Sequence, residues 1–229
     1  ADTGFSDITT DDEYSGYISA ISKMGIMNGY PDNTFRPALP ITFNQAVKLI
    51  VSSLGHGRFA EAEGGYPYGY LAVAARLGIT KGVNEQGDAY VSGGVFAQLL
   101  VNSAEVPIVE KATFGEGSNE IYVAKENSSF LTLYHKIYEF EGQIKGNYFT
   151  RISEGQALKR DEIAIGDRVF KTGKTKAADL LGRNVRAYAK LQDDTYTLLY
   201  VETFRSEEMT ILSDDISPNT TSDRIYYTK

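Results

Sequence analysis

The chain has 229 residues, with 23 Lys and Arg against 30 Asp and Glu, which gives a formal net charge of −7. A hydrophobic fraction of 42% with 12% aromatic residues is typical of a folded protein rather than a disordered one. The acidic balance argues against nucleic acid as a partner, because counterion release requires clustered Lys and Arg. Uninterrupted apolar runs are short, so we predict no membrane insertion.

The chain contains no cysteine and only two histidines, His56 and His135. The lack of cysteine excludes disulfides, thiolate metal sites and cysteine nucleophiles, and two histidines argue against a zinc site. We therefore predict neither a metal nor another cofactor. The chain starts at Ala1 without an initiator methionine or an apolar leader, which we interpret as a mature or shortened form.

Two repeats emerge when the sequence is compared with itself. Residues 17–29 match residues 70–82, with a tyrosine, two glycines, an isoleucine and a basic residue at the same spacing. Residues 42–53 match residues 92–103, which share a hydroxyl residue at the start and then a leucine and a valine. The two units are of similar length, which indicates an internal duplication.

The first unit, at about 5–55, is expected to form a helix, a structured loop and a second helix. Its first helix has the pattern of a capping box at Thr10–Glu13 and a glycine stop at Gly25. The apolar face expected for this helix comprises Tyr14, Tyr17, Ile18, Ile21 and Met24. Residues 29–37 form the loop, and Thr42 with Gln45 forms a second capping box.

The second unit, at 66–104, repeats this plan after a glycine-rich connector at 55–66. Ser92 is its expected helix cap, and the apolar face of its last helix comprises Val95, Phe96, Leu99 and Leu100. The loop of this unit, at 82–90, lacks the Tyr-x-Asp pattern and the Pro found in the first.

The first unit resembles an S-layer homology (SLH) repeat. Phe5-Ser6-Asp7, the helix, Gly25 through Pro37 and Thr42 follow the family order F-x-D, helix, G-I-x-x-G-Y-x-D-G-x-F-x-P and T-R-A-E. The resemblance covers residues 5–104 and implies a secreted bacterial protein at the cell wall or cell surface. It also implies binding to secondary cell-wall polysaccharide or a peptidoglycan-linked glycan.

The resemblance places the glycan-facing rim at five residues of the first unit: Gly29, Tyr30, Asp32, Thr42 and Gln45. The family's cationic arginine is replaced by Phe43 in the first unit and by Gly93 in the second. Arginine suits acidic sugars because its guanidinium presents a fixed fork of donors. Its absence weakens the case for glycan binding, although the helix-capping residues Thr42 and Gln45 remain. Tyrosines can also stack on sugar rings, and Tyr66, Tyr68 and Tyr70 are candidates for that role.

The remainder of the chain changes from helical to strand periodicity. We predict a linker at 105–120 and a mostly-β domain at 121–229, so that residues 1–104 form the other domain and the fold class is α+β. Strands are expected at Ile121–Val123, Phe130–Tyr134, Ile137–Ile144, Glu162–Ile165, Val169–Phe170, Val185–Lys190, Tyr196–Phe204, Met209–Leu212 and Ile225–Tyr227. Hairpin signals at Gly166-Asp167 and Gln192-Asp193-Asp194 favour a small barrel, OB-like or SH3-like.

The candidate catalytic motifs in the sequence depart from the patterns that catalysis requires. Gly173-Lys174-Thr175 ends like a phosphate-binding loop, but the first glycine of that motif is replaced by Arg168. Adjacent carboxylates such as Glu207 and Glu208 point apart on a strand or helix, unlike the facing pair of a glycosidase. We therefore predict a non-enzymatic protein without catalytic residues.

The best functional hypothesis is a non-catalytic module that anchors a surface protein to cell-wall polysaccharide. Two alternatives remain open. The repeats serve as a packing or homo-oligomerisation scaffold without sugar binding, or the chain is the non-catalytic part of a larger surface glycoside hydrolase.

Overall fold

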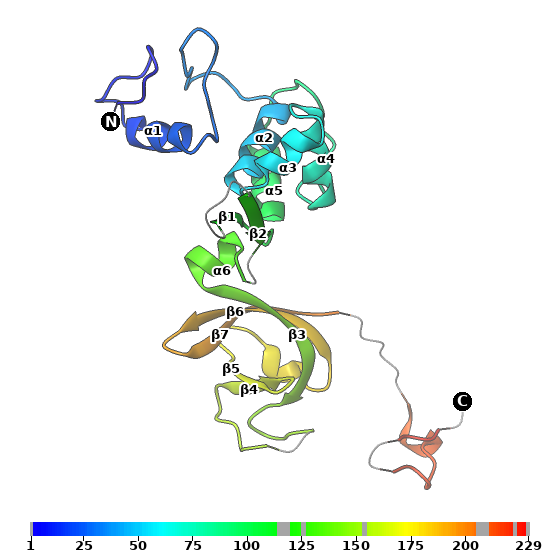
Figure 1. Cartoon of the computed structure of the whole chain (residues 1–229). Helices are drawn as coiled ribbons and strands as arrows, with labels where there is room; N and C mark the ends of the chain where they lie inside the picture. The colour runs from blue at the N-terminus through cyan, green and yellow to red at the C-terminus, as the bar shows by residue number, and fades with distance from the viewer. Residues whose placement is uncertain are drawn as a thin grey trace. The chain divides into compact units, whose positions relative to one another are not determined.

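Figure 1 shows the computed structural model of the chain, which describes residues 2–113, 120–124, 127–152, 155–204, 211–221 and 224–227. The chain forms two compact units, Ala1–Lys136 and Ile137–Lys229. The first is mainly helical and the second mainly β, so the predicted mixture of helix and sheet is confirmed. The helices of the first unit are α1 (Ser15–Lys23), α2 (Phe43–Ser53), α3 (Gly57–Ala62), α4 (Tyr68–Arg76), α5 (Gly93–Ser103) and α6 (Phe130–His135).

Helix ends follow the local signals closely. Thr42 caps α2 in a full capping box with Gln45, and the Ser92 hydroxyl accepts the backbone N–H of Val95 at 3.3 Å. Helices α1, α2 and α4 each end at a glycine with positive φ, at Gly25, Gly55 and Gly78. At each of these ends the first three backbone N–H groups after the helix bond back to its last turn.

The capping box predicted at Thr10–Glu13 is wrong. Helix α1 begins later, at Ser15, and has no side-chain cap. Asp12 instead accepts hydrogen bonds from the backbone and hydroxyl of Thr9, which forms a turn before the helix. Its carboxylate is thereby engaged outside the helix.

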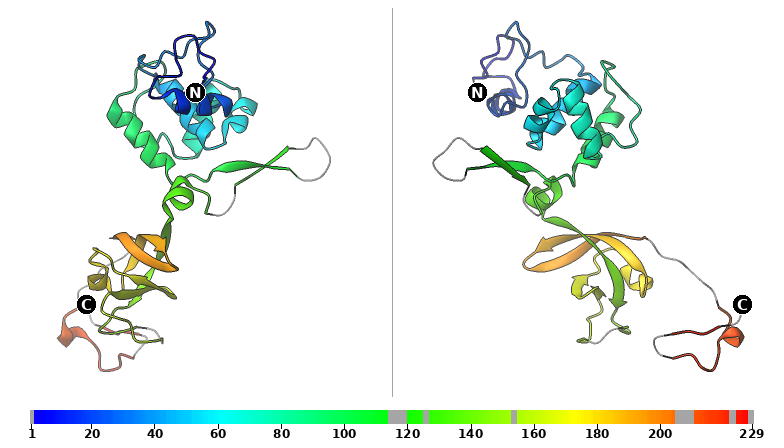
Figure 2. Two further views of the ribbon diagram at one scale, coloured as in Figure 1. Left: turned by 90° about the vertical axis from the view of Figure 1, so that its left-hand side faces the viewer. Right: turned by 45° about the vertical axis from the view of Figure 1, so that its right-hand side comes forward.

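Helix α2 lies at the centre of the helical core and packs on both α4 and α5 (Figure 2). It buries its apolar stripe completely, as do the residues of α4 that face it. The core comprises Phe43, Ala46, Val47, Ile50, Val51, Leu54, Ala60, Tyr70, Val73, Ala74, Ile79, Leu99 and Val106. The second helix of one repeat therefore packs on the first helix of the next.

Two segments differ from their predicted conformation. The glycine-rich connector contains helix α3, and Phe130–Tyr134, predicted as a strand, forms α6. A short apolar run does not distinguish strand from helix by periodicity. Here Ser129 decides the outcome, because its hydroxyl accepts the backbone N–H of Thr132 and caps the helix.

Residues 105–136 group with the helices. The predicted linker at 105–120 contains β1 (Val109–Thr113), which pairs antiparallel with β2 (Glu120–Ala124). The backbone N–H of Val109 donates to Leu54 at 2.9 Å, which ties this hairpin to the end of α2. The division between the units accordingly falls after Lys136.

The second unit is built on five strands that close in the order β3-β4-β5-β7-β6. Neighbouring strands are antiparallel except for β5 and β7, which are parallel. The strands are β3 (Ile137–Gly146), β4 (Glu162–Ile165), β5 (Arg168–Lys171), β6 (Asn184–Gln192) and β7 (Thr195–Thr203). A 3-10 helix, η1 (Ala177–Leu180), lies between β5 and β6 in the sequence.

Side chains fill the interior of this closed sheet. Small residues on β6, Ala187 and Ala189, leave room for an aromatic cluster of Phe140, Phe170 and Tyr196, whose ring centroids are 4.9–5.8 Å apart. Alternation of small and large side chains suits the limited space of a five-stranded barrel.

The predicted hairpins are confirmed. Gly166 has positive φ between β4 and β5, and both Asp193 and Asp194 have positive φ between β6 and β7. Of the two last predicted strands, Ile225–Tyr227 makes a single bridge between Ile216 and Tyr227. In Met209–Leu212, residues 209 and 210 lie outside the described residues and the other two form no strand. A further 3-10 helix is η2 (Ser213–Asp215).

Candidate functional site

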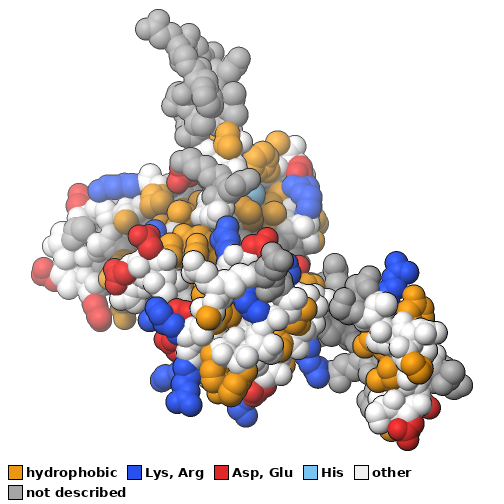
Figure 3. Space-filling model, turned by 90° about the horizontal axis from the view of Figure 1, so that it is seen from below, with side chains coloured by type: hydrophobic (Ala, Val, Ile, Leu, Met, Phe, Trp, Pro, Cys, Tyr) orange, Lys and Arg blue, Asp and Glu red, His pale blue; other side chains and the backbone are white. Residues whose placement is uncertain are grey.

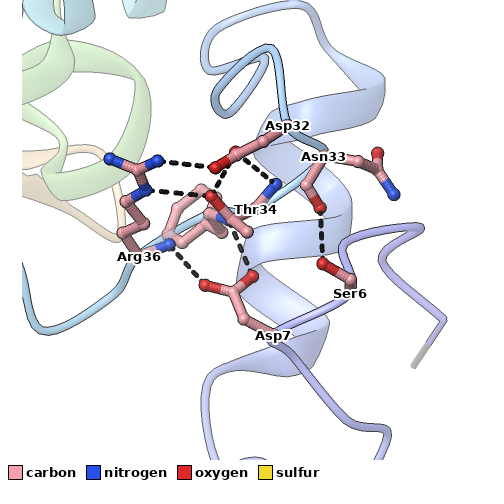
Figure 4. Close-up of polar contacts among 7 residues, drawn as sticks. Ser6, Asp7, Asp32, Asn33, Thr34 and Arg36 are labelled. Carbon is pink, nitrogen blue, oxygen red and sulfur yellow. Dashed lines mark hydrogen bonds and ion pairs between the residues drawn. The ribbon is translucent and has the colours of Figure 1, made fainter.

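The loop at 29–37 is held in place by the segment that precedes α1 (Figure 4). The Asp7 carboxylate accepts the backbone N–H groups of Phe35 and Arg36, both at 2.7 Å. These bonds, the Phe35 bond first, lower the pKa of Asp7 despite partial desolvation. The rings of Phe5 and Phe35 pack beside them at 5.3 Å. Asp7 and Phe5 therefore anchor the loop.

Asp32 is held within the loop by three neighbouring groups. Its carboxylate accepts the Thr34 hydroxyl at 2.6 Å and the Thr34 backbone N–H at 3.2 Å, and it pairs with the Arg36 guanidinium at 2.6 Å. The Thr34 hydroxyl and then Arg36 lower the pKa of Asp32 to about 2. The guanidinium of Arg36 also lies over the ring of Tyr30, 4.2 Å from its centroid.

Gly29 occupies a position that only glycine fits. Its φ is +68°, and an added Cβ would contact the Phe5 ring and lie 2.8 Å from the Thr34 carbonyl oxygen. The loop closes here because the Tyr30 N–H donates to that same carbonyl at 2.8 Å. A close backbone approach of this kind is a structural reason for glycine.

The start of α2 is fixed by the second repeat. The N–H groups of Phe43 and Asn44 donate to Ala89 and Gly87, at 2.9 and 3.1 Å. Phe43, which stands where the family has arginine, is buried in the helical core. Its side chain therefore cannot face a ligand.

A cavity of about 340 Å³ opens between the loop and α2. It is lined by Ile26, Met27, Asn28, Gly29, Tyr30, Phe35, Arg36, Pro37, Leu39, Ile41, Gln45, Lys48, Leu49 and Tyr66. Its volume matches a small-molecule or sugar-sized site.

The charged residues of this lining are both cationic, Arg36 and Lys48. Arg36 is neutralised in part by Asp32. The ammonium of Lys48 lies 5.6 Å from the ring centroid of Tyr66 and 5.9 Å from that of Tyr70. Within the described part of the chain, no carboxylate forms an ion pair with Lys48. The cavity thus combines a free cation with aromatic faces.

Three of the five predicted site residues line this cavity, namely Gly29, Tyr30 and Gln45. Asp32 and Thr42 do not line it. Asp32 positions Arg36, and Thr42 holds Gln45 through reciprocal hydrogen bonds at 2.9 and 3.4 Å.

Sequence reasoning missed Arg36 and Lys48. Arg36 belongs to the 29–37 loop, which also contains the predicted site residues Tyr30 and Asp32, so its place in the sequence could have indicated a role in the site. Lys48 carries no motif, and only the fold turns it toward the loop.

The three tyrosines suggested for sugar stacking lie in different surroundings. Tyr66 lines the cavity, and Tyr68 is exposed away from its lining. The suggestion for Tyr70 is wrong, because its ring is buried between helices and its hydroxyl donates to Glu61 at 2.8 Å.

Replacing Thr34 with valine should raise the pKa of Asp32 toward its ordinary value, because the strongest donor to the carboxylate is lost. The Asp32 pKa is lowered by folding, so its stabilising contribution is present above about pH 4 and is lost as the pH falls through about 2. Carboxyl titration by NMR measures both carboxylates. The lowered pKa of Asp7 serves as the control, since backbone donors cause it. An unchanged Asp32 pKa would contradict this assignment.

The described residues offer few other candidate sites. No group of three or more His, Asp or Glu there is placed to hold a metal, and no described helix is long and apolar enough to cross a bilayer. His56 is buried and its Nε2 contacts the Pro107 carbonyl at 2.9 Å, which gives it a structural role. Lys and Arg are interspersed with Asp and Glu on the face shown in Figure 3.

Comparisons with known proteins identify one family domain and several surface or cell wall proteins. The model of the S-layer homology domain family matches residues 4–47. The chain is 27% identical over 135 residues to a surface layer protein of Brevibacillus choshinensis, covering 59% of this chain and 12% of that protein. It is 28% identical over 133 residues to the middle cell wall protein of Brevibacillus brevis, covering 58% and 12%.

A third relative is a cell surface protein of Thermoanaerobacter kivui, 28% identical over 123 residues, which cover 54% of this chain and 16% of that protein. The chain therefore spans only a small part of the length of these relatives. No solved structure matches it.

Proposed function

We infer that this chain, which carries an S-layer homology domain at residues 4–47, is a cell-surface protein held at the cell wall through that domain. We propose that the anchoring ligand is an acidic secondary cell-wall polysaccharide or a peptidoglycan-linked glycan. It binds in the cavity between the 29–37 loop and α2. The relatives are named as surface and cell wall proteins, which supports a non-enzymatic role.

The observation that carries this proposal is the unpaired charge of Lys48 in the cavity. The described lining contains two cations and no carboxylate, so its local charge favours an anion. Asp32 offsets the charge of Arg36, whereas the ammonium of Lys48 lies over the rings of Tyr66 and Tyr70 and forms no ion pair among the described residues. A negatively charged sugar substituent is the group that satisfies such a lysine.

The aromatic side chains of the lining supply the second element of sugar recognition. Tyr30 and Tyr66 present rings at the cavity, and tyrosine combines an apolar face with a hydroxyl. Lys48 lies five residues after Phe43 on α2. We propose that it supplies the cation that the family draws from the arginine absent at Phe43.

Co-sedimentation of the full chain with Gram-positive cell-wall sacculi tests this function. Sacculi that retain secondary polysaccharide should pellet the protein, and sacculi stripped of it should not. Equal binding to both preparations would redirect the proposal to the peptidoglycan itself. No binding to either would reject the anchoring function and leave the repeats as a scaffold.

For the second unit we propose the OB-like alternative of the two barrel types. The strand order β3-β4-β5-β7-β6, the parallel pair β5 and β7, and the position of η1 before the fourth strand support it. The fold alone assigns no ligand to this unit, since function lies in sites rather than in folds.

A further inference from the structure

Equivalent first helices of the two repeats have different surroundings. In the second repeat, α4 packs on α2, and Tyr70 is only 4% exposed. Its equivalent on α1, Tyr17, is 73% exposed, and Met24 is 70% exposed where Leu77 is partly buried. Tyr14, the N-cap residue of α1 three positions before Tyr17, is also exposed. Tyr14, Tyr17 and Met24, here called the α1 stripe, form an apolar surface without a covering helix in the described residues.

Equivalent second helices show the same contrast. In the first repeat, Ile50 and Val51 of α2 are 4% and 0% exposed and belong to the core in which α2 packs on α4. Their equivalents on α5, Leu100 and Val101, are 47% and 69% exposed. Together with the exposed Ala97, they form the α5 stripe at positions i, i+3 and i+4 of one helix face.

The interface between α2 and α4 explains both stripes. It joins the second helix of one repeat to the first helix of the next. Among the described elements, α1 has no second helix before it and α5 has no first helix after it. Within the described residues, both halves of one interface are therefore exposed, one on α1 and the other on α5.

We propose that the α1 stripe of one copy packs on the α5 stripe of a second copy, as α4 packs on α2 within the chain. The chemistry of the stripes identifies this occupant. Tyr17 and Met24 of the α1 stripe stand where the helical core has Tyr70 and Leu77, and Val101 of the α5 stripe stands where it has Val51. Exposed apolar surface of this kind marks an interaction site.

The resulting contact is head-to-tail, because it joins two different surfaces. Each copy that uses one stripe still offers the other. The assembly therefore grows into a closed ring or an open filament, depending on the rotation between copies.

The test measures the mass of the full chain by light scattering after gel filtration, across a range of concentrations. The wild-type chain should form dimers or larger species as concentration rises. Tyr17→Asp destroys the α1 stripe and Val101→Asp destroys the α5 stripe, so each variant alone should be monomeric. Their equimolar mixture should form a heterodimer, because each variant supplies the stripe that the other lacks. Ala72→Asp, on the exposed side of α4, is the matched control and should assemble like the wild type.

Three results would overturn the proposal. A wild-type chain that stays monomeric throughout would show that another structure covers the stripes. Assembly by Val101→Asp alone would indicate a symmetric contact between α1 helices. A mixture that stays monomeric, with both variants showing wild-type circular dichroism, would exclude the head-to-tail pairing. No glycan is present in this experiment, so its outcome is independent of the proposed anchoring function.

Discussion

Replacing Lys48 by glutamate is expected to lower binding to polysaccharide-bearing sacculi by a factor of roughly 10 to 100. Lys48 is the cation in the cavity lining that has no carboxylate partner among the described residues. A glutamate would place a like charge beside an acidic sugar and add repulsion to the lost attraction. Co-sedimentation at several protein concentrations gives the apparent affinity.

Two further variants make this result specific. Lys48→Met retains the aliphatic packing and removes only the charge, so it should weaken binding less than the glutamate variant does. Lys81→Glu makes the same charge change at an exposed position outside the cavity and should bind like the wild type. If Lys81→Glu lost as much affinity as Lys48→Glu, the effect would come from net charge and the cavity would not be the site.

Gly29→Ala is expected to destabilise the first unit by about 2–5 kcal/mol. The left-handed backbone at φ +68° costs an alanine about 1–2 kcal/mol. The new Cβ also meets the Phe5 ring and the Thr34 carbonyl, and overpacking of this kind costs about 1–3 kcal/mol more. Urea unfolding measures the change. Because Gly29 lines the cavity, binding to sacculi should fall in parallel.

The second repeat supplies the matched control for this variant. Gly82 is the equivalent of Gly29, has φ +74°, and has no atom within 4 Å of an added Cβ. Gly82→Ala therefore carries the backbone cost alone and should lose about 1–2 kcal/mol without loss of binding. Equal losses in the two variants would mean that the contacts with Phe5 and Thr34 do not constrain the loop.

Features encoded by neighbouring residues were predictable from the sequence. The Thr42 and Gln45 capping box, the glycine stop at Gly25 and the turn at Gly166 each depend on hydrogen bonds or backbone angles within a few residues. The SLH pattern also located the loop that borders the cavity. Local signals failed where two were in competition, as at Ser129, whose cap converts a short apolar run into α6.

The sequence by itself determined two repeats, the loop between their helices and the β-rich second half, because periodicity and turn chemistry act over short distances. The tertiary structure alone decided which side chains share the cavity and which apolar faces are covered. Lys48 becomes a site residue only because α2 packs beside the loop. Likewise, Tyr70 is buried and its equivalent Tyr17 is exposed, although their local sequences agree. Burial depends on the presence of a packing partner, and that partner lies far away in the chain.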